Sequence, residues 1–435
     1  MKTIDKIPTG KIGRTGKMVQ TGIKIGGNYL KYYGKKALNS DLSREELDQD
    51  NAEDIYNGLK SLKGSALKVA QMLSMEKSLL PGAYVEKFSL AQFSVPPLSG
   101  PLVRKTFKKY HGQFPEDLYD TFSLESVNAA SIGQVHRATK DGKELAVKIQ
   151  YPGVADSISS DLAMVKPIAL KMFNLQGKDS EKYFKEVEGK LLEETDYKLE
   201  VAQSKEISAA CAHIPNLKFP VYYEELSSEK IITMNWMQGK HLSEFAKVNK
   251  DQQAADTIGQ TLWDFYMYQM HELKAVHADP HPGNFLISDK KELIAIDFGC
   301  IKRLPEEFYE PYFELTKKEN FEDPAFFRNK LLELDILKEG DSEKEVDFFS
   351  ELYYQMLSMF AKPLNSDTFD FGDNKFLEAI SALSEKYSRE PELRKMNVNR
   401  GSEHFIYISR TFMGLYTLLN SLGSTVKINN YKRFV

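Results

Sequence analysis

The chain reads His277-Ala-Asp-Pro-His-Pro-Gly-Asn284 and, after a short apolar stretch, Ile296-Asp-Phe-Gly299, and these two motifs decide the fold. Phosphoryl transfer requires a carboxylate near the attacking hydroxyl group, with an amide oxygen and a second carboxylate that hold Mg²⁺ on the phosphates. Asp279 followed five residues later by Asn284, with Asp297 after a strand-like stretch, matches the spacing of these groups. We therefore predict that Asp279 is the catalytic carboxylate and that Asn284 and Asp297 are magnesium ligands.

Three histidines, His271, His277 and His281, suggest zinc binding as an alternative for the same stretch. Pro280 and Pro282 prevent a continuous helix that would present the three rings together. No cysteine lies nearby in the sequence as a fourth ligand. The pattern therefore favours phosphoryl transfer over a zinc site.

Strand patterns precede these motifs. Asn128 to Ala138 and Glu144 to Tyr151 predict two strands joined by a turn at Asp141-Gly142, and Lys230 to Trp236 predicts another. The second of these strands carries Lys148 near its end, which is the position of a lysine that anchors nucleotide phosphates.

Helical patterns lie on both sides of these strands. They run from Ile55 to about Met75, over Tyr183 to Ala202, and through most of the chain after Gly239. This order predicts an α+β fold with segregated helical and sheet-rich lobes. Met234 and Met237, where the strands give way to helices, are expected either to line an adenine pocket or to pack in the core.

The candidate phosphate loop departs from the usual pattern. Kinases use G-x-G-x-x-G-x-V, whereas the register here is Asn128-x-Ala130-x-x-Gly133-x-Val135, so only the third glycine is present. The added Cβ atoms predict a stiffer loop that sits differently on the phosphates. The residues expected to contact the nucleotide from this loop are Ala129, Ala130, Ser131, Gly133 and Val135.

Composition is that of an ordinary globular protein: 435 residues, of which 42% are hydrophobic and 28% charged. Two cysteines, Cys211 and Cys300, cannot build a disulfide framework, which favours a reducing compartment. We see neither an apolar run of about 18 residues, as a membrane span requires, nor a secretory leader. The expected location is cytoplasmic.

The net charge of −4 conceals a basic N-terminal arm. Residues 1–40 carry nine basic side chains and one acidic one, a local charge of +8 that leaves −12 on the remainder. Apolar residues such as Ile23 and Leu30 are interleaved with the lysines, and each lysine contributes about 1 kcal/mol near an anionic leaflet. We expect a peripheral membrane anchor rather than a nucleic-acid site, because no recognised nucleic-acid module accompanies the arm. A solvated tail is the alternative.

Together the motifs resemble the UbiB/ADCK (AarF) family of atypical kinase-like proteins. The resemblance rests on Ala129–His136, Ala146–Val154, Glu194–Tyr197 and the two motifs quoted above, in order from about residue 60 to 305. It implies a two-lobed protein-kinase-like fold with an N-terminal helical extension packed over the active site. The implied parts are the arm (1–40), the extension (41–115), the N-lobe with a helical insertion (116–238) and the mostly helical C-lobe (239–435).

The resemblance also implies roles for residues outside the catalytic loop. Lys148 becomes the nucleotide lysine and Glu200 its partner. The family signature Lys-x-Gly-Gln stands here as Lys68-Val-Ala-Gln71, a regulatory pair expected to contact Glu194 and Asp196, although Lys68 is alternatively an ordinary solvated lysine. The resemblance implies that Glu200 faces Lys148 and that Glu194 faces Lys68, which is consistent with the separation of about 120° between the two glutamates on one regular helix.

The function implied by the resemblance is that of an ATPase or a small-molecule or lipid kinase with ATP (or ADP) and Mg²⁺ as cofactors. The implied setting is isoprenoid-quinone (coenzyme Q) biosynthesis or lipid homeostasis, with an anionic membrane, a lipid or quinone-precursor substrate and the proteins of a biosynthetic complex as partners. Nucleic acid is not expected. A protein kinase, a nucleotide-gated lipid-binding module and an aminoglycoside- or choline-type phosphotransferase are the alternatives.

Overall fold

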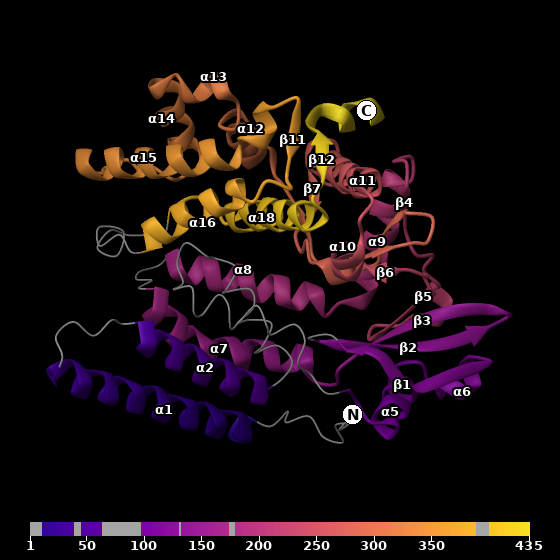
Figure 1. Cartoon of the computed structure of the whole chain (residues 1–435). Coiled ribbons are helices and arrows are strands. Elements are labelled where there is room, and N and C mark those ends of the chain that lie inside the picture. The colour runs from indigo at the N-terminus through magenta and orange to yellow at the C-terminus, as the bar shows by residue number, and fades with distance from the viewer. Residues whose placement is uncertain (1–10, 39–44, 63–96, 130–131, 174–178, 389–399) are drawn as a thin grey trace. The chain divides into compact units, whose positions relative to one another are not determined.

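The computed structural model describes residues 11–38, 45–62, 97–129, 132–173, 179–388 and 400–435. The chain divides into two compact units, one from Met1–Val201 and Val221–Trp236, the other from Ala202–Pro220 and Met237–Val435. Helices, then a sheet-rich region, then helices follow one another along the chain (Figure 1), so the predicted α+β class is confirmed. Within the described ranges, no helix is long and apolar enough to cross a membrane.

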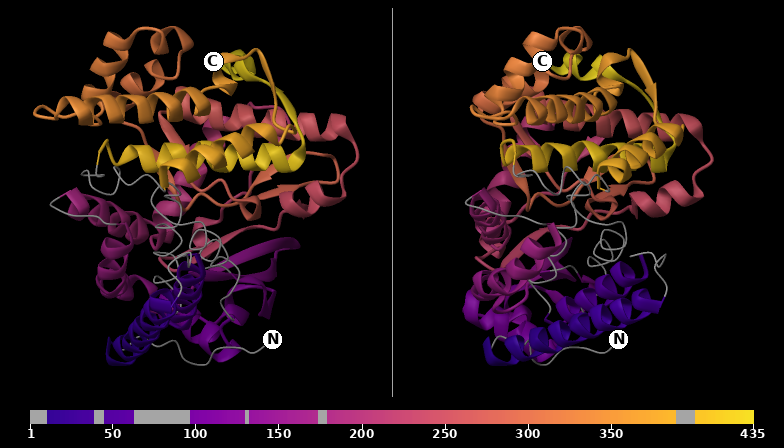
Figure 2. Two further views of the ribbon diagram at one scale, coloured as in Figure 1. Left: turned by 60° about the vertical axis from the view of Figure 1, so that its left-hand side comes forward. Right: turned by 90° about the vertical axis from the view of Figure 1, so that its left-hand side faces the viewer.

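Two N-terminal helices, α1 (Lys11–Leu38) and α2 (Glu45–Leu62), lie side by side (Figures 1 and 2). Asn28 of α1 donates its side-chain N–H to Asn51 Oδ1 at 3.3 Å and to Asp54 Oδ2 at 2.9 Å. The described part of the basic arm is therefore helical. The helix predicted over Ile55 to Met75 is confirmed as far as Leu62, and its remainder lies outside the described residues.

The first unit contains an antiparallel sheet in the order β1-β2-β3-β5. Its strands are β1 (Thr121–Ala129), β2 (Gly133–Lys140), β3 (Lys143–Gln150) and β5 (Ile231–Asn235). The predicted strand Asn128 to Ala138 is wrong, because Asn128 lies in β1, which ends at Ala129, and Gly133 begins the next strand. The Asp141-Gly142 turn is confirmed, and both residues have the positive φ, 51° and 73°, that a two-residue hairpin of this kind requires.

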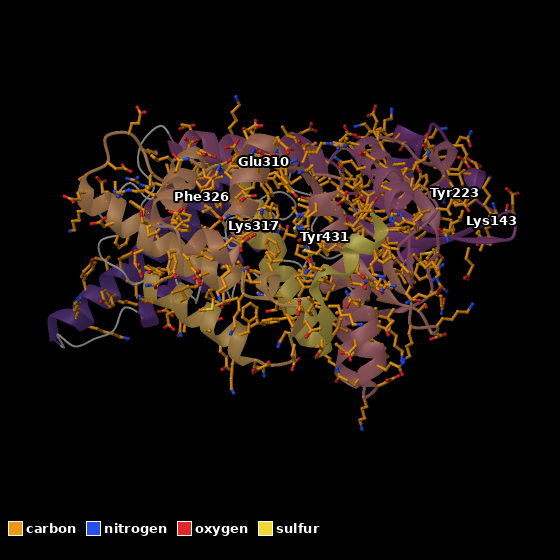
Figure 3. All side chains as sticks on the ribbon, turned by 90° about the horizontal axis from the view of Figure 1, so that it is seen from above. Lys143, Tyr223, Glu310, Lys317, Phe326 and Tyr431 are labelled. Atoms are coloured by element: carbon orange, nitrogen blue, oxygen red, sulfur yellow. The ribbon has the colours of Figure 1, made fainter. Side chains whose placement is uncertain are left out.

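Two cation–aromatic contacts lie on this hairpin, one of them next to its turn. Lys143 Nζ lies 5.3 Å from the ring centroid of Tyr223 (Figure 3), and the Arg137 guanidinium lies 4.2 Å from the ring of Trp236. Trp236 is partly exposed at the end of the first unit's last segment.

Helices follow the sheet in the sequence: α7 (Val154–Phe173), α8 (Asp179–Glu194) and α9 (Tyr197–Cys211). The predicted continuous helix from Tyr183 to Ala202 is wrong, since it is interrupted at Thr195 and Asp196. The Asp196 carboxylate accepts hydrogen bonds from the backbone N–H groups of Lys198 and Leu199, both at 3.1 Å, and so begins α9 as its N-cap. The 120° separation of Glu194 and Glu200 therefore does not apply.

The second unit contains short strands around the catalytic-loop motif. One sheet has the order β4-β9-β8-β6, from β4 (Leu217–Lys218), β6 (Lys240–His241), β8 (Phe285–Ile287) and β9 (Leu293–Ala295). β7 (Ala275–His277) pairs with β10 (Ile301–Arg303). These strands bring the two motifs of the sequence into one region of the unit.

The central helix of this unit is α11 (Gln252–His271). Its Trp263 is fully buried and donates its indole N–H to the Ile428 carbonyl at 2.8 Å. Gly259 lets α11 approach the C-terminal segment closely, because a Cβ there would lie 2.5 Å from Ser424 Cβ. The predicted helical C-terminal third is confirmed. The remaining helices and strands of the second unit are α10 (Leu242–Val248), α12 (Glu306–Glu314), α13 (Lys318–Phe321), α14 (Pro324–Glu333), α15 (Glu343–Phe360), α16 (Lys375–Ser388), α18 (His404–Leu422), β11 (Thr368–Asp370) and β12 (Thr425–Lys427).

Candidate active site

Lys148 and Glu200 form an ion pair in the first unit. Lys148 lies on β3, opposite Val135 of β2, and its Nζ lies 2.6 Å from Glu200 Oε1 on α9. Their side chains are only 12% and 4% exposed, so each charge is balanced by the other in a poorly solvated place. The structure therefore brings together the two residues that the sequence paired.

Tyr197, which sequence reasoning missed, lies beside this pair. Its ring is fully buried, and Lys148 Nζ lies 5.3 Å from the ring centroid. A Cβ at Gly133 would lie 2.7 Å from Tyr197 Oη and 2.8 Å from the Ile149 carbonyl oxygen. The surviving glycine of the phosphate loop is therefore required by this close packing. The sequence signal was the tyrosine that directly follows Glu194-Thr-Asp196.

The interruption between α8 and α9 is held by two donors, one at the end of β3 and one in the turn directly before β5. The Thr195 carbonyl accepts hydrogen bonds from Gln150 Nε2 at 3.0 Å and from Lys230 Nζ at 2.9 Å. Burial lowers the pKa of Lys230, while the carboxylate of Asp196 acts in the opposite direction. These contacts fix the start of α9, and hence Glu200, relative to the strand that carries Lys148.

Several other residues predicted to contact the nucleotide lie on strands β1, β2 and β5 or directly after them. Gly133 and Val135 begin β2, Ala129 ends β1, and Met234 is buried on β5 opposite Ala146. Met237 follows β5 and belongs to the second unit. The predicted contacts that lie outside the described residues are Lys68, Gln71, Ala130 and Ser131.

Asp279 lies in the second unit, in the loop after β7. Its backbone carbonyl accepts hydrogen bonds from Asn284 Nδ2 at 2.9 Å and from the His281 N–H at 2.7 Å, which holds the loop in a compact turn. Its carboxylate Oδ1 accepts a hydrogen bond from Arg410 Nη2 of α18, and the two side chains form an ion pair. Arg410 was missed because it follows Asp279 by 131 residues in a segment patterned only as helical core.

Asn284 and Asp297 meet at one end of the β8–β9 ladder. Phe285 pairs with Ala295, and the Ile296 N–H donates to the Asn284 carbonyl at 3.0 Å, so Asp297 comes one residue after this contact. Asp297 Oδ1 accepts the Gly299 N–H at 2.9 Å. Because the Asn284 amide nitrogen is directed to the loop, its side-chain oxygen is the atom suited to a metal. One amide and one carboxylate oxygen fit Mg²⁺, which binds few protein ligands beside phosphates and water.

The three histidines have separate surroundings. His271 Nδ1 lies 2.9 Å from Tyr309 Oη, and His277 Nδ1 lies 3.2 Å from Tyr266 Oη. His281 Nδ1 accepts the Gly283 N–H at 3.0 Å. Burial, with the nearby lysines, lowers the pKa of His271 to about 4.

Comparisons with known proteins agree with this arrangement. Residues 90–324, more than half of the chain, match the family described as ABC1 atypical kinase-like domain. The "probable serine/threonine-protein kinase abkA" of Dictyostelium discoideum is 26% identical over 98% of this chain and 80% of its own length. The mitochondrial atypical kinase COQ8B of Danio rerio is 26% identical over 98% of this chain and 68% of its own length.

A solved structure supports the fold. The Mycobacterium tuberculosis protein Rv3197, in complex with erythromycin, superposes with a TM-score of 0.58 at 24% identity, over 89% of this chain and 96% of that one. This likeness, together with the two motifs and the family match, confirms the kinase-like α+β fold. The chain belongs to the ABC1 family of atypical kinase-like proteins, which is also known as the UbiB/ADCK or AarF family.

Proposed function

We propose that this atypical kinase-like protein is an ATP- and Mg²⁺-dependent ATPase or kinase that acts on a small or lipidic substrate in support of coenzyme Q biosynthesis. The observation that carries the proposal is the placement of Asn284 and Asp297 at one end of a two-stranded ladder. Asp279 lies in the turn that ends at Asn284, bound to it by a side-chain hydrogen bond. A carboxylate for the acceptor and two oxygen ligands for a metal are thus contributed by one short hairpin and the loop before it.

Each residue has a defined task in this proposal. Lys148, oriented by Glu200 and Tyr197, binds phosphate oxygens of the nucleotide. Asn284 and Asp297 hold Mg²⁺, which neutralises charge on the phosphates when it is bound. Asp279 orients the attacking water or hydroxyl group and receives its proton.

A lipidic substrate is favoured by the exposed face of α1. Ile23, Leu30 and Tyr33 are 69%, 78% and 62% exposed, although apolar side chains are usually covered. Lys24 and Lys31 are exposed beside them. Apolar side chains flanked by lysines on a helix suit the surface of an anionic membrane. The names of the COQ8 relatives place those proteins in coenzyme Q metabolism, which fits a membrane-bound quinone precursor.

The experiment is an ATPase assay with and without anionic liposomes and a phenol that resembles a quinone precursor. We expect Mg²⁺-dependent release of phosphate that rises when liposomes and the phenol are present. Incorporation of phosphate into a protein, without stimulation by lipid, would instead favour the protein-kinase alternative that the name of abkA suggests.

The Asp297→Asn variant tests the magnesium ligand. It removes one carboxylate charge, so we expect the Mg²⁺-dependent part of the thermal shift on ATP binding to disappear and phosphate release to fall at least about 100-fold. Asp289→Asn is the matched control, because Asp289 is exposed in the turn of the same hairpin. A thermal shift in Asp297→Asn equal to that of the wild type would refute the metal assignment.

A further inference from the structure

Helix α18 packs against the catalytic loop and against β10 through three residues on one face. Tyr407, Arg410 and Gly414 are spaced three and four residues apart, so they project from the same side of the helix. Arg410 pairs with Asp279. Gly414 contacts Pro280 so closely that a Cβ there would overlap the proline ring and lie 2.9 Å from the Pro280 carbonyl oxygen. The helix thus contacts two consecutive residues of the loop.

The third contact reaches the strand after the Asp297 motif. Lys302 of β10 is buried, and its Nζ lies 4.7 Å from the ring centroid of Tyr407. β10 pairs with β7, and the Ala278 N–H donates to the Cys300 carbonyl at 2.8 Å. The segment before Asp279 and the segment after Asp297 are therefore joined to each other and to α18.

The Arg410–Asp279 pair is poorly solvated. The two side chains are 7% and 16% exposed, so their charges are little screened by water. Burial raises the pKa of the neighbouring Tyr266 well above its usual value. The negative charge of Asp279 raises this pKa further, whereas the positive charge of Arg410 lowers it. A carboxylate in such a place requires a compensating charge, and the guanidinium supplies one in a fixed planar geometry.

We propose that Arg410 is a positioning residue for the reaction: it holds the Asp279 carboxylate through Oδ1 and so sets the direction in which this group meets the acceptor hydroxyl or water. This inference rests on the proposed function, in which Asp279 serves the acceptor. The two hydrogen bonds to the Asp279 carbonyl fix the backbone of the loop, and Arg410, on a helix of 19 residues, fixes the carboxylate. Misplacement of a catalytic group by about 1 Å reduces turnover on the order of 100-fold.

The test compares Arg410→Met, Arg410→Lys and a control, Thr417→Ala. Thr417 is exposed on the same helix, where its hydroxyl donates to the Met413 carbonyl of its own helix. We expect Arg410→Met to lower kcat for ATP hydrolysis by about 100-fold while KM for ATP stays within twofold, because the nucleotide contacts are elsewhere. Arg410→Lys should have a kcat about tenfold higher than that of Arg410→Met, since lysine restores the positive charge without the planar fork of the guanidinium.

Two results would overturn the inference: a kcat of Arg410→Met within threefold of the wild type, or a loss that appears in KM for ATP. The inference would also be contradicted if Arg410→Lys restored the melting temperature but lowered kcat as much as Arg410→Met does.

Failure of the proposed function is recognised separately, as absence of turnover in the wild type. The pair is then examined by melting temperatures of Arg410→Met, Asp279→Asn and the double variant. Coupled residues give a double variant no less stable than the worse single variant, whereas additive losses would show that Arg410 does not hold Asp279.

Discussion

At the scale of single residues, Gly133 shows how a loop that has lost two of its three glycines still depends on the third. The position has ordinary backbone dihedrals and needs glycine for space, because Tyr197 and the Ile149 carbonyl occupy the volume of a side chain. Motif spacing identifies Gly133 but cannot reveal the tyrosine that packs on it, since the two residues are 64 positions apart.

Gly133→Ala should therefore destabilise the protein and weaken ATP binding. The added Cβ must displace Tyr197, which contacts Lys148, so we expect a loss of about 1–3 kcal/mol in the free energy of unfolding. Urea unfolding and the ATP-dependent thermal shift measure the two effects. Gly189→Ala on α8 is the control: no atom lies within 4 Å of its added Cβ, and a gain of up to about 1 kcal/mol is expected.

At the scale of elements, the interruption between α8 and α9 is the clearest departure from what the sequence predicts. Apolar periodicity continues through Thr195 and Asp196 with neither proline nor glycine, so the pattern favours one helix. Asp196 prefers to cap a new helix, and Gln150 and Lys230 stabilise the interruption by binding the Thr195 carbonyl. Gln150 ends β3 and Lys230 lies in the turn before β5, so periodicity within the helical segment cannot reveal these two donors.

The cap is tested by Asp196→Ala. Loss of the carboxylate leaves the N–H groups of Lys198 and Leu199 unpaired at the start of α9, so we expect a loss of about 1 kcal/mol in stability. ATP affinity should also fall, because Glu200 lies in the first turn of this helix. Asp196→Asn, which keeps a capping oxygen, should retain most of both properties. Equal losses in the two variants would mean that charge, and not capping, is what matters at this position.

At the scale of the whole molecule, the order of helices and strands and the grouping of the two motifs could be predicted, because periodicity and motif spacing are local properties. The residues that hold the motifs could not, since Tyr197, Arg410 and Lys230 reach them from distant parts of the chain. The four-part division of the chain and the role of Lys68 stay predictions.

The chain also carries a buried neutral histidine in each compact unit. These histidines should make the protein sensitive to acid. Burial lowers the pKa of His136 and of His271 to about 4. Between about pH 6.5 and 4 the unfolded chain binds protons there that the folded chain does not, so stability falls as pH decreases through this window. We expect the two histidines together to lower the free energy of unfolding by about 3 kcal/mol between pH 7 and 5, as measured by urea unfolding. His136→Gln should remove about half of that dependence; an unchanged dependence would mean that this ring is already protonated in the native state.

Each compact unit also carries its own optical reporter. The chain has two tryptophans, Trp236 in the first unit, under the Arg137 guanidinium, and Trp263 in the buried centre of the second. With excitation selective for tryptophan over the 22 tyrosines, a Trp236→Phe variant emits only from the second unit, and a Trp263→Phe variant only from the first. Fluorescence of these two variants can therefore follow, in one chain and without a dye, whether acid, urea or nucleotide acts first on the unit that holds Lys148 or on the unit that holds Asp279.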